Sequence, residues 1–198
     1  MFGLGKKNSE LESFANLLVK AIREMFWERA ELKFSAMPKL ERKNIIEYEK
    51  RMRVDGMEKF NHNPTFISTV NFYASELDMK KNKTLGALIT YVEQSYIVEL
   101  LKMLKYPPAD DENEDAMKDC CGTLCNIIAG RFKSEVVAAG YIELEMSHFS
   151  NFRNTSFRGI DFCFNEFDKY EISFEIKGAK RLVVEMTMGT VPHASNRT

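Results

Sequence analysis

The chain has 198 residues, with 28 basic and 29 acidic side chains and a formal net charge of −1. A near-neutral chain lacks the excess of Lys and Arg that nucleic-acid binding requires, so we expect no nucleic-acid partner. No apolar run approaches the ~20 residues of a membrane span, and the N-terminal sequence MFGLGKKNSE is too polar for a signal peptide. The sequence therefore predicts a cytoplasmic protein without a membrane partner, whose four cysteines are reduced thiols.

The N-terminal part of the chain predicts a helix followed by a charged segment. Ser9 and Glu12 fit a capping box, and the apolar spacing after them predicts a helix over residues 9–28. Residues 31–36 alternate weakly between apolar and polar and are interpreted as a short strand that the next proline ends. Residues 38–62 are strongly charged and are interpreted as a solvated excursion, with a partner-binding arm as the alternative.

The middle of the chain predicts a hairpin and a second helix. Residues 66–75 and 85–92 are rich in β-branched and aromatic side chains, which favour a pleated sheet. The polar turn between them predicts an antiparallel hairpin. Residues 96–105 have helical apolar spacing, and the two prolines that follow end that helix.

The C-terminal third of the chain predicts strands. Four segments alternate between apolar and polar residues, which indicates strands with one buried face each: 142–146, 160–164, 172–176 and 182–188. The tail from Gly189 onward is expected to be frayed. The whole pattern predicts one α+β domain over residues 1–198, with helices packed on a largely antiparallel mixed sheet.

A long helix is predicted over residues 115–139, and it has two unlike faces. At about 100° per residue, one side is apolar; it carries Met117, Cys121, Leu124, Ile128 and Phe132. The opposite side, called the polar stripe below, carries Asp119, Thr123, Asn126, Gly130 and Lys133. Asn is a mediocre helix former, and a glycine inside a helix costs roughly 1 kcal/mol against Ala. The stripe is therefore either an ordinary solvated face or a binding or catalytic surface.

The cysteines and histidines do not combine into a familiar site. Cys121 and Cys125 are one helical turn apart, but a zinc site needs about four ligands, and Cys163 and a distant histidine would have to complete it. Helical cysteines are more often small buried apolar residues, so no metal site is expected. Ser147 and His148 are adjacent on a predicted strand and point to opposite faces, which argues against a catalytic pair.

The polar stripe resembles a known signature. The segment D-x-x-x-T-x-x-N-I-I-A-G is similar to the signature helix of the CheC, CheX and FliY chemotaxis phosphatases. That helix carries an acidic residue or Ser, three residues, Glu, two residues and Asn, followed after twenty-two residues by Pro. Asp119 and Asn126 match the first position and the Asn. Thr123 stands in place of the Glu, and Phe149 stands in place of the Pro.

The resemblance extends to the order of the helices and strands, and it implies a CheC/CheX-like fold. Because this family commonly pairs edge strands in its dimers, it also implies a homodimer. Family members dock the signature helix onto a phosphorylated CheY-type response regulator. There the Asn amide orients the attacking water and the Glu contacts the regulator's lysine.

The leading functional expectation is therefore a regulator-binding protein whose phosphatase activity is weak or lost, because Thr123 carries no charge. Partner binding would use the polar stripe: Asp119, Thr123, Asn126, Gly130 and Lys133. The first alternative is an active aspartyl-phosphate phosphatase that relies on Asn126, with Asp119 in support. The second is a structural or assembly protein related to flagellar-switch components. No cofactor is expected on this chain, since any Mg²⁺ would sit on the regulator.

Overall fold

The computed structural model describes residues 4–32, 34, 36–106, 113–153 and 156–196. A seven-stranded antiparallel sheet forms the centre of the fold. Its strands are β1 (Lys39–Asn44), β4 (Thr65–Tyr73), β5 (Gly86–Glu93), β6 (Glu145–Met146), β7 (Ser150–Arg153), β9 (Asp168–Ile176) and β10 (Ala179–Met188). The strand order is β1-β9-β10-β5-β4, and both β6 and β7 pair with β4.

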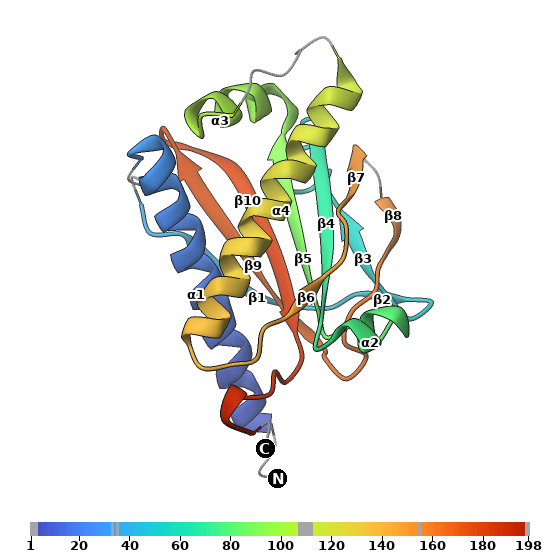
Figure 1. The fold of residues 1–198 in the computed structure, drawn as a ribbon. Coiled ribbons are helices and arrows are strands. Elements are labelled where there is room, and N and C mark those ends of the chain that lie inside the picture. Colours follow the sequence, from blue (N-terminus) through green and yellow to red (C-terminus); the bar gives the residue numbers. More distant parts are fainter. Residues whose placement is uncertain (1–3, 33, 35, 107–112, 154–155, 197–198) are drawn as a thin grey trace.

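Helices cover one face of this sheet and a small sheet covers the other (Figure 1). The helices are α1 (Leu4–Ala30), α2 (Glu76–Lys80), α3 (Ile97–Met103) and α4 (Glu114–Ala138), with the short 3-10 helices η1 (Gln94–Tyr96) and η2 (Ala194–Asn196). The small sheet consists of β2 (Glu47–Tyr48), β3 (Arg51–Asp55) and β8 (Ser156–Ile160), in that order. None of the described helices is both long enough and apolar enough to cross a membrane.

The helical layer is held by aromatic packing and by two ion pairs at the surface. Phe132 of α4 packs edge-on against Phe14 of α1, with ring centroids 6.4 Å apart, and against Phe72 of β4 at 5.5 Å. All three rings are fully buried, and burying such a side chain contributes about 1.5–3 kcal/mol. Lys20–Glu135 and Arg131–Glu28 then join α1 to α4 at their rim. The helix that carries the polar stripe is therefore fixed on the sheet.

The opposite face of the sheet buries charges as well as apolar side chains. The Lys59 ammonium donates to Glu171 and Glu185 at 2.5 and 2.7 Å, and the Tyr91 hydroxyl donates to Glu185 at 2.7 Å. The alternating pattern predicted that the polar residues of the last two strands, Glu175 and Glu185 among them, face solvent. Glu175 does, whereas Glu185 is fully buried and pairs with Lys59 from the segment after β3, because a buried carboxylate needs a cationic partner.

The predicted antiparallel pairing of β4 with β5, the two later helices and the last two strands are confirmed, although α2 occupies part of the predicted polar turn. Three predictions in the N-terminal part are wrong: the helix cap at Ser9, the strand over residues 31–36 and the solvated excursion over residues 38–62. The residues before Ser9 are already helical, so α1 begins at Leu4 and Ser9 lies inside the helix rather than at its N-cap. No described residue in 31–36 lies in a strand, and residues 33 and 35 lie outside the described residues. Phe34 instead turns inward and packs between Phe26 and Phe174, at 5.1 and 5.2 Å.

The charged segment 38–62 is part of the fold, not a solvated excursion. β1 pairs along its whole length with β9 in the main sheet, and β3 pairs with β8. Met52, Val54 and Phe60 are buried against the main sheet. The high charge of this segment does not mean that it is solvated, because several of its basic residues pair with acidic residues of the sheet, as Lys59 does.

The C-terminal third also departs from the predicted pattern. Of the first predicted strand, 142–146, only Glu145–Met146 is paired, as β6. The second predicted strand, 160–164, lies too far along the chain: the observed strand β8 ends at Ile160. The prediction of a frayed tail is wrong for residues 189–193. Val191 is buried, and the His193 ring stacks on Tyr141 at 4.3 Å.

Candidate functional site

The sequence of α4 explains both its ends. The Asn113 side chain accepts hydrogen bonds from the N–H groups of Asp115 and Ala116, both at 3.1 Å, which satisfies two of the free donors at the start of the helix. Gly140 follows the last turn with φ +89°, a backbone conformation that glycine adopts without strain. The helix is thus well defined over its length, and its two faces have fixed directions.

The structure places the two predicted faces of α4 as expected. The five apolar residues named above are all buried in the core between α4 and the sheet. On the opposite side, Asp119, Thr123 and Asn126 are all exposed to solvent. Among the described residues, none of these three side chains forms a hydrogen bond or an ion pair. They are therefore free to contact a partner, and together they form the exposed part of the polar stripe.

The last two stripe residues lie at a surface hollow. Gly130 and Lys133 are half-buried and line a groove of about 410 Å³; Ser134, Val137, Glu143 and Met146 complete its lining. A Cβ atom at Gly130 would meet no atom within 4 Å, so packing within the chain does not require a glycine there. The stripe thus continues from exposed polar side chains into an open groove beside the C-terminal half of α4.

Phe149, which stands in place of the family Pro, packs directly on the site helix. A Cβ atom at Gly122 would lie only 2.4 Å from the Phe149 ring and 2.8 Å from the Asn151 amide. The ring therefore needs the glycine in order to reach α4 beside Thr123. The role of Gly122 was not predicted from the sequence, although a second glycine inside a long helix is a signal that another part of the chain approaches the helix closely.

The cysteines are structural. Cys121 and Cys125 are fully buried, and the Cys125 thiol lies 3.5 Å from the Ser68 carbonyl oxygen. Burial raises the pKa of Cys125 to about 11 and raises the pKa of Cys121 as well, so both are thiols at neutral pH. Among the described residues, no group of three or more His, Cys, Asp or Glu side chains is arranged to hold a metal ion.

Similar folds are found among solved protein structures. No family model and no curated protein sequence matches the chain. Solved structures do match over most of its length. A putative chemotaxis protein from Desulfovibrio vulgaris Hildenborough is 12% identical with a TM-score of 0.53, and the match covers 88% of this chain and 96% of that one.

Two further structures extend the comparison. The CheX–CheY–BeF3–Mg²⁺ complex from Borrelia burgdorferi matches with 12% identity and a TM-score of 0.50, covering 89% of this chain and 98% of that chain. FliY from Thermotoga maritima matches with 12% identity and a TM-score of 0.53, covering 96% of this chain and 91% of that chain. The chain therefore has the α+β fold of the CheC, CheX and FliY chemotaxis proteins, as the signature helix predicted.

Proposed function

We propose that this protein is a CheX-like signalling protein that binds a CheY-type response regulator, or a related partner, through the polar stripe of α4. The observation that carries the proposal is the exposure of Asp119, Thr123 and Asn126, which have no partner among the described residues, on a rigid helix. The solved CheX–CheY complex among the similar structures supports this choice of partner. We further propose that the chain acts as a single cytoplasmic domain and as a homodimer.

The chemistry of the stripe favours binding over catalysis. An exposed amide such as that of Asn126 both donates and accepts hydrogen bonds, so it suits a water molecule or a polar partner group. Thr123 carries no carboxylate, so it cannot supply a charge-assisted contact to a cationic partner. Asp119 lies one turn away and has a short side chain. Phosphatase activity is therefore proposed to be weak or lost, with no cofactor on this chain and Mg²⁺ only on the regulator.

Two measurements on a purified CheY-type regulator from the same organism test the proposal. We expect the protein to bind the BeF3-activated regulator and to leave the decay of its phosphorylated form unchanged. Replacing Asn126 by Ala should weaken binding about tenfold, as expected for the loss of a hydrogen-bonded pair. Asn165→Ala, in an exposed loop away from α4, is the matched control. Binding that does not respond to Asn126→Ala would contradict the assignment of the stripe.

The first alternative, an active phosphatase, is supported by the free Asn126 amide. In that case the wild-type protein accelerates decay of the phosphorylated regulator and Asn126→Ala abolishes the acceleration. Thr123→Glu restores the carboxylate of the family pattern, so it should raise activity if the helix docks in the family manner. Unchanged decay with wild-type protein rejects this alternative.

The second alternative is an assembly role, supported by the likeness to FliY and to the middle domain of FliM from Vibrio alginolyticus, which is 14% identical with a TM-score of 0.50. It predicts no detectable regulator binding and no effect of Asn126→Ala. Copurification of flagellar-switch proteins with this chain would then favour the assembly role over the leading proposal.

A further inference from the structure

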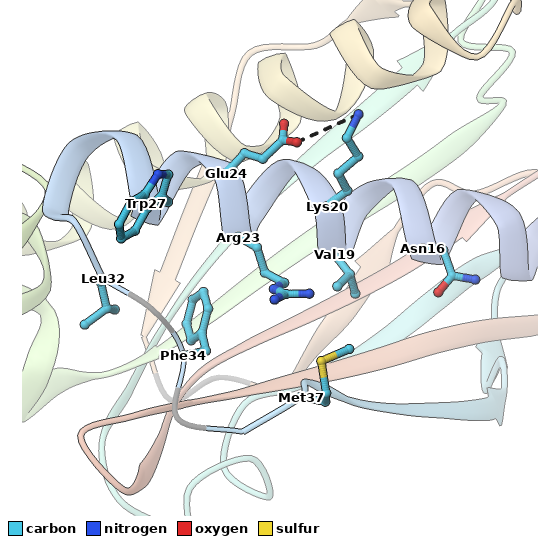
Figure 2. Close-up of a pocket in the computed structure, with 9 residues that line it drawn as sticks. All are labelled: Asn16, Val19, Lys20, Arg23, Glu24, Trp27, Leu32, Phe34 and Met37. Atoms are coloured by element: carbon cyan, nitrogen blue, oxygen red, sulfur yellow. Dashed lines mark ion pairs between the residues drawn. The ribbon is translucent and has the colours of Figure 1, made fainter.

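A second surface lies on α1, away from the polar stripe. It is a groove of about 780 Å³ between the outer face of α1 and the segment that follows this helix. One wall is the outer face of α1 from Asn16 to Trp27, and the opposite wall carries Leu32, Phe34 and Met37 (Figure 2). We call it the α1 groove. Its volume falls within the range of binding pockets, about 300–1,000 Å³.

The apolar part of the α1 groove rests on the core. Phe34 is anchored by the buried rings of Phe26 and Phe174, so this wall has a fixed position. Trp27 and Met37 are 50% and 74% exposed, although both are large apolar side chains. Large apolar side chains gathered in a concave surface are typical of a binding site, whereas single exposed ones are ordinary.

The charges in the α1 groove do not balance. Lys20 pairs with Glu135 at 2.7 Å and lies 3.8 Å from Glu24, so these charges compensate one another. Arg23 is exposed and forms no hydrogen bond or ion pair among the described residues. Figure 2 shows its side chain leaving the helix toward Phe34 and Val19, whereas Lys20 and Glu24 turn the other way. One uncompensated guanidinium therefore borders an apolar surface.

The shape of the α1 groove indicates an extended occupant. Asn16 and Trp27 mark its ends along α1 (Figure 2). They are about three turns apart, or about 16 Å at 1.5 Å per residue. An extended peptide rises about 3.3 Å per residue, so roughly five residues span this length. A compact ligand would leave one end empty.

We propose that the α1 groove binds an extended segment of a partner protein in which a Glu or Asp is flanked by apolar side chains. The carboxylate pairs with the Arg23 guanidinium, whose planar donors suit a bidentate contact, and the apolar side chains pack on Phe34, Trp27 and Met37. This surface lies on a different helix from the polar stripe, so the proposal does not depend on regulator binding.

The protein carries its own probe for this proposal, because Trp27 is its single tryptophan. The test uses acetylated pentapeptide amides with a central Glu between Leu, Ile, Phe or Met residues in every combination, and the same set with Gln in place of Glu. We expect a saturable change in Trp27 emission with Glu peptides, weakened about tenfold in the matched Gln peptides. The binding should also weaken as salt is added.

Two variants make the test specific. Arg23→Gln should reduce the affinity for Glu peptides to that for Gln peptides, while an unchanged thermal midpoint shows that the variant is folded. Arg53→Gln, an exposed arginine of β3, is the matched control and should bind Glu peptides as the wild type does.

Several results would overturn the proposal. One is the absence of any emission change with every Glu peptide at millimolar concentration, and another is equal affinity for Glu and Gln peptides. A third is an emission change that follows protein concentration without peptide, because a second copy of the chain would then occupy the groove. A fourth is a response to phosphatidylglycerol vesicles alone, since a lipid surface would then be the ligand.

Discussion

At the scale of the residue, a substitution at Gly130 should change the stability of the fold and the affinity for a partner in opposite directions. The surroundings of this mid-helix glycine are empty, so Gly130→Ala should stabilise the protein by up to about 1 kcal/mol. If a partner packs closely on the polar stripe, the same change should weaken regulator binding severalfold. Urea unfolding and a binding titration measure the two effects, and a variant that is destabilised would contradict the packing argument.

Gly159 provides the contrasting control for that experiment. It has φ +96°, and a Cβ atom there would lie 1.8 Å from the Met52 carbonyl oxygen across the β3–β8 pair. Gly159→Ala should therefore destabilise the protein by about 2 kcal/mol or more, through strained backbone and a forced separation of the strands. The same substitution thus has opposite signs at two glycines, and only the three-dimensional surroundings distinguish them.

At the scale of the element, α4 was the most predictable part of the molecule and the charged segment the least. The 3.6-residue period of α4 defined both its buried and its exposed face, because a long helix on a sheet follows that period. The small sheet and the segment after β3 were not predictable, because Lys59, which is buried in that segment, is compensated by carboxylates 112 and 126 residues away in sequence, and no local pattern contains that pairing. The role of Gly122 and the α1 groove were not predicted for the same reason. Phe149 contacts Gly122, and Phe34 lines the groove, only through tertiary packing.

The buried charges under the small sheet predict how stability depends on pH. Burial alone would raise the pKa of Glu171, but the ammonium groups of Lys43 and Lys59 outweigh it and lower the pKa to about 2. Glu is near 4.3 when unfolded. The folded pKa is the lower one, so this stabilisation is present above about pH 4.5 and is lost as the pH falls toward 2, by roughly 3 kcal/mol in all.

Urea unfolding between pH 7 and pH 2 measures this loss. Glu171→Gln should destabilise the protein at pH 7 by about 3 kcal/mol, because the buried ammonium of Lys59 and the exposed ammonium of Lys43 lose a partner, and it should flatten the acid limb of the stability curve. Glu175→Gln is the matched control, since Glu175 lies on the same strand but is exposed and has no ion pair among the described residues. An acid limb that survives Glu171→Gln would assign the pH dependence to other groups.

At the scale of the whole molecule, the free edge of the main sheet bears on the proposed homodimer. β1 has β9 on one side and, among the described residues, no strand on the other. Its sequence KLERKN is mostly charged, and charged edge strands normally resist pairing with other chains. Pairing of two β1 strands therefore requires a register in which opposite charges face each other.

One antiparallel register meets that requirement. If the two-fold axis passes beside Arg42, each Glu41 faces the partner subunit's Lys43, and the self-complementary contact closes as a dimer. The two Arg42 side chains then face each other, but each already pairs with Asp168 of its own chain. Glu41→Lys places like charges opposite each other there and should raise the dimer dissociation constant at least about tenfold. Glu175→Lys, on the neighbouring strand β9, should leave it unchanged. Light scattering during size-exclusion chromatography reads the mass directly: a wild-type monomer rejects the homodimer, and a Glu41→Lys dimer places the interface away from β1.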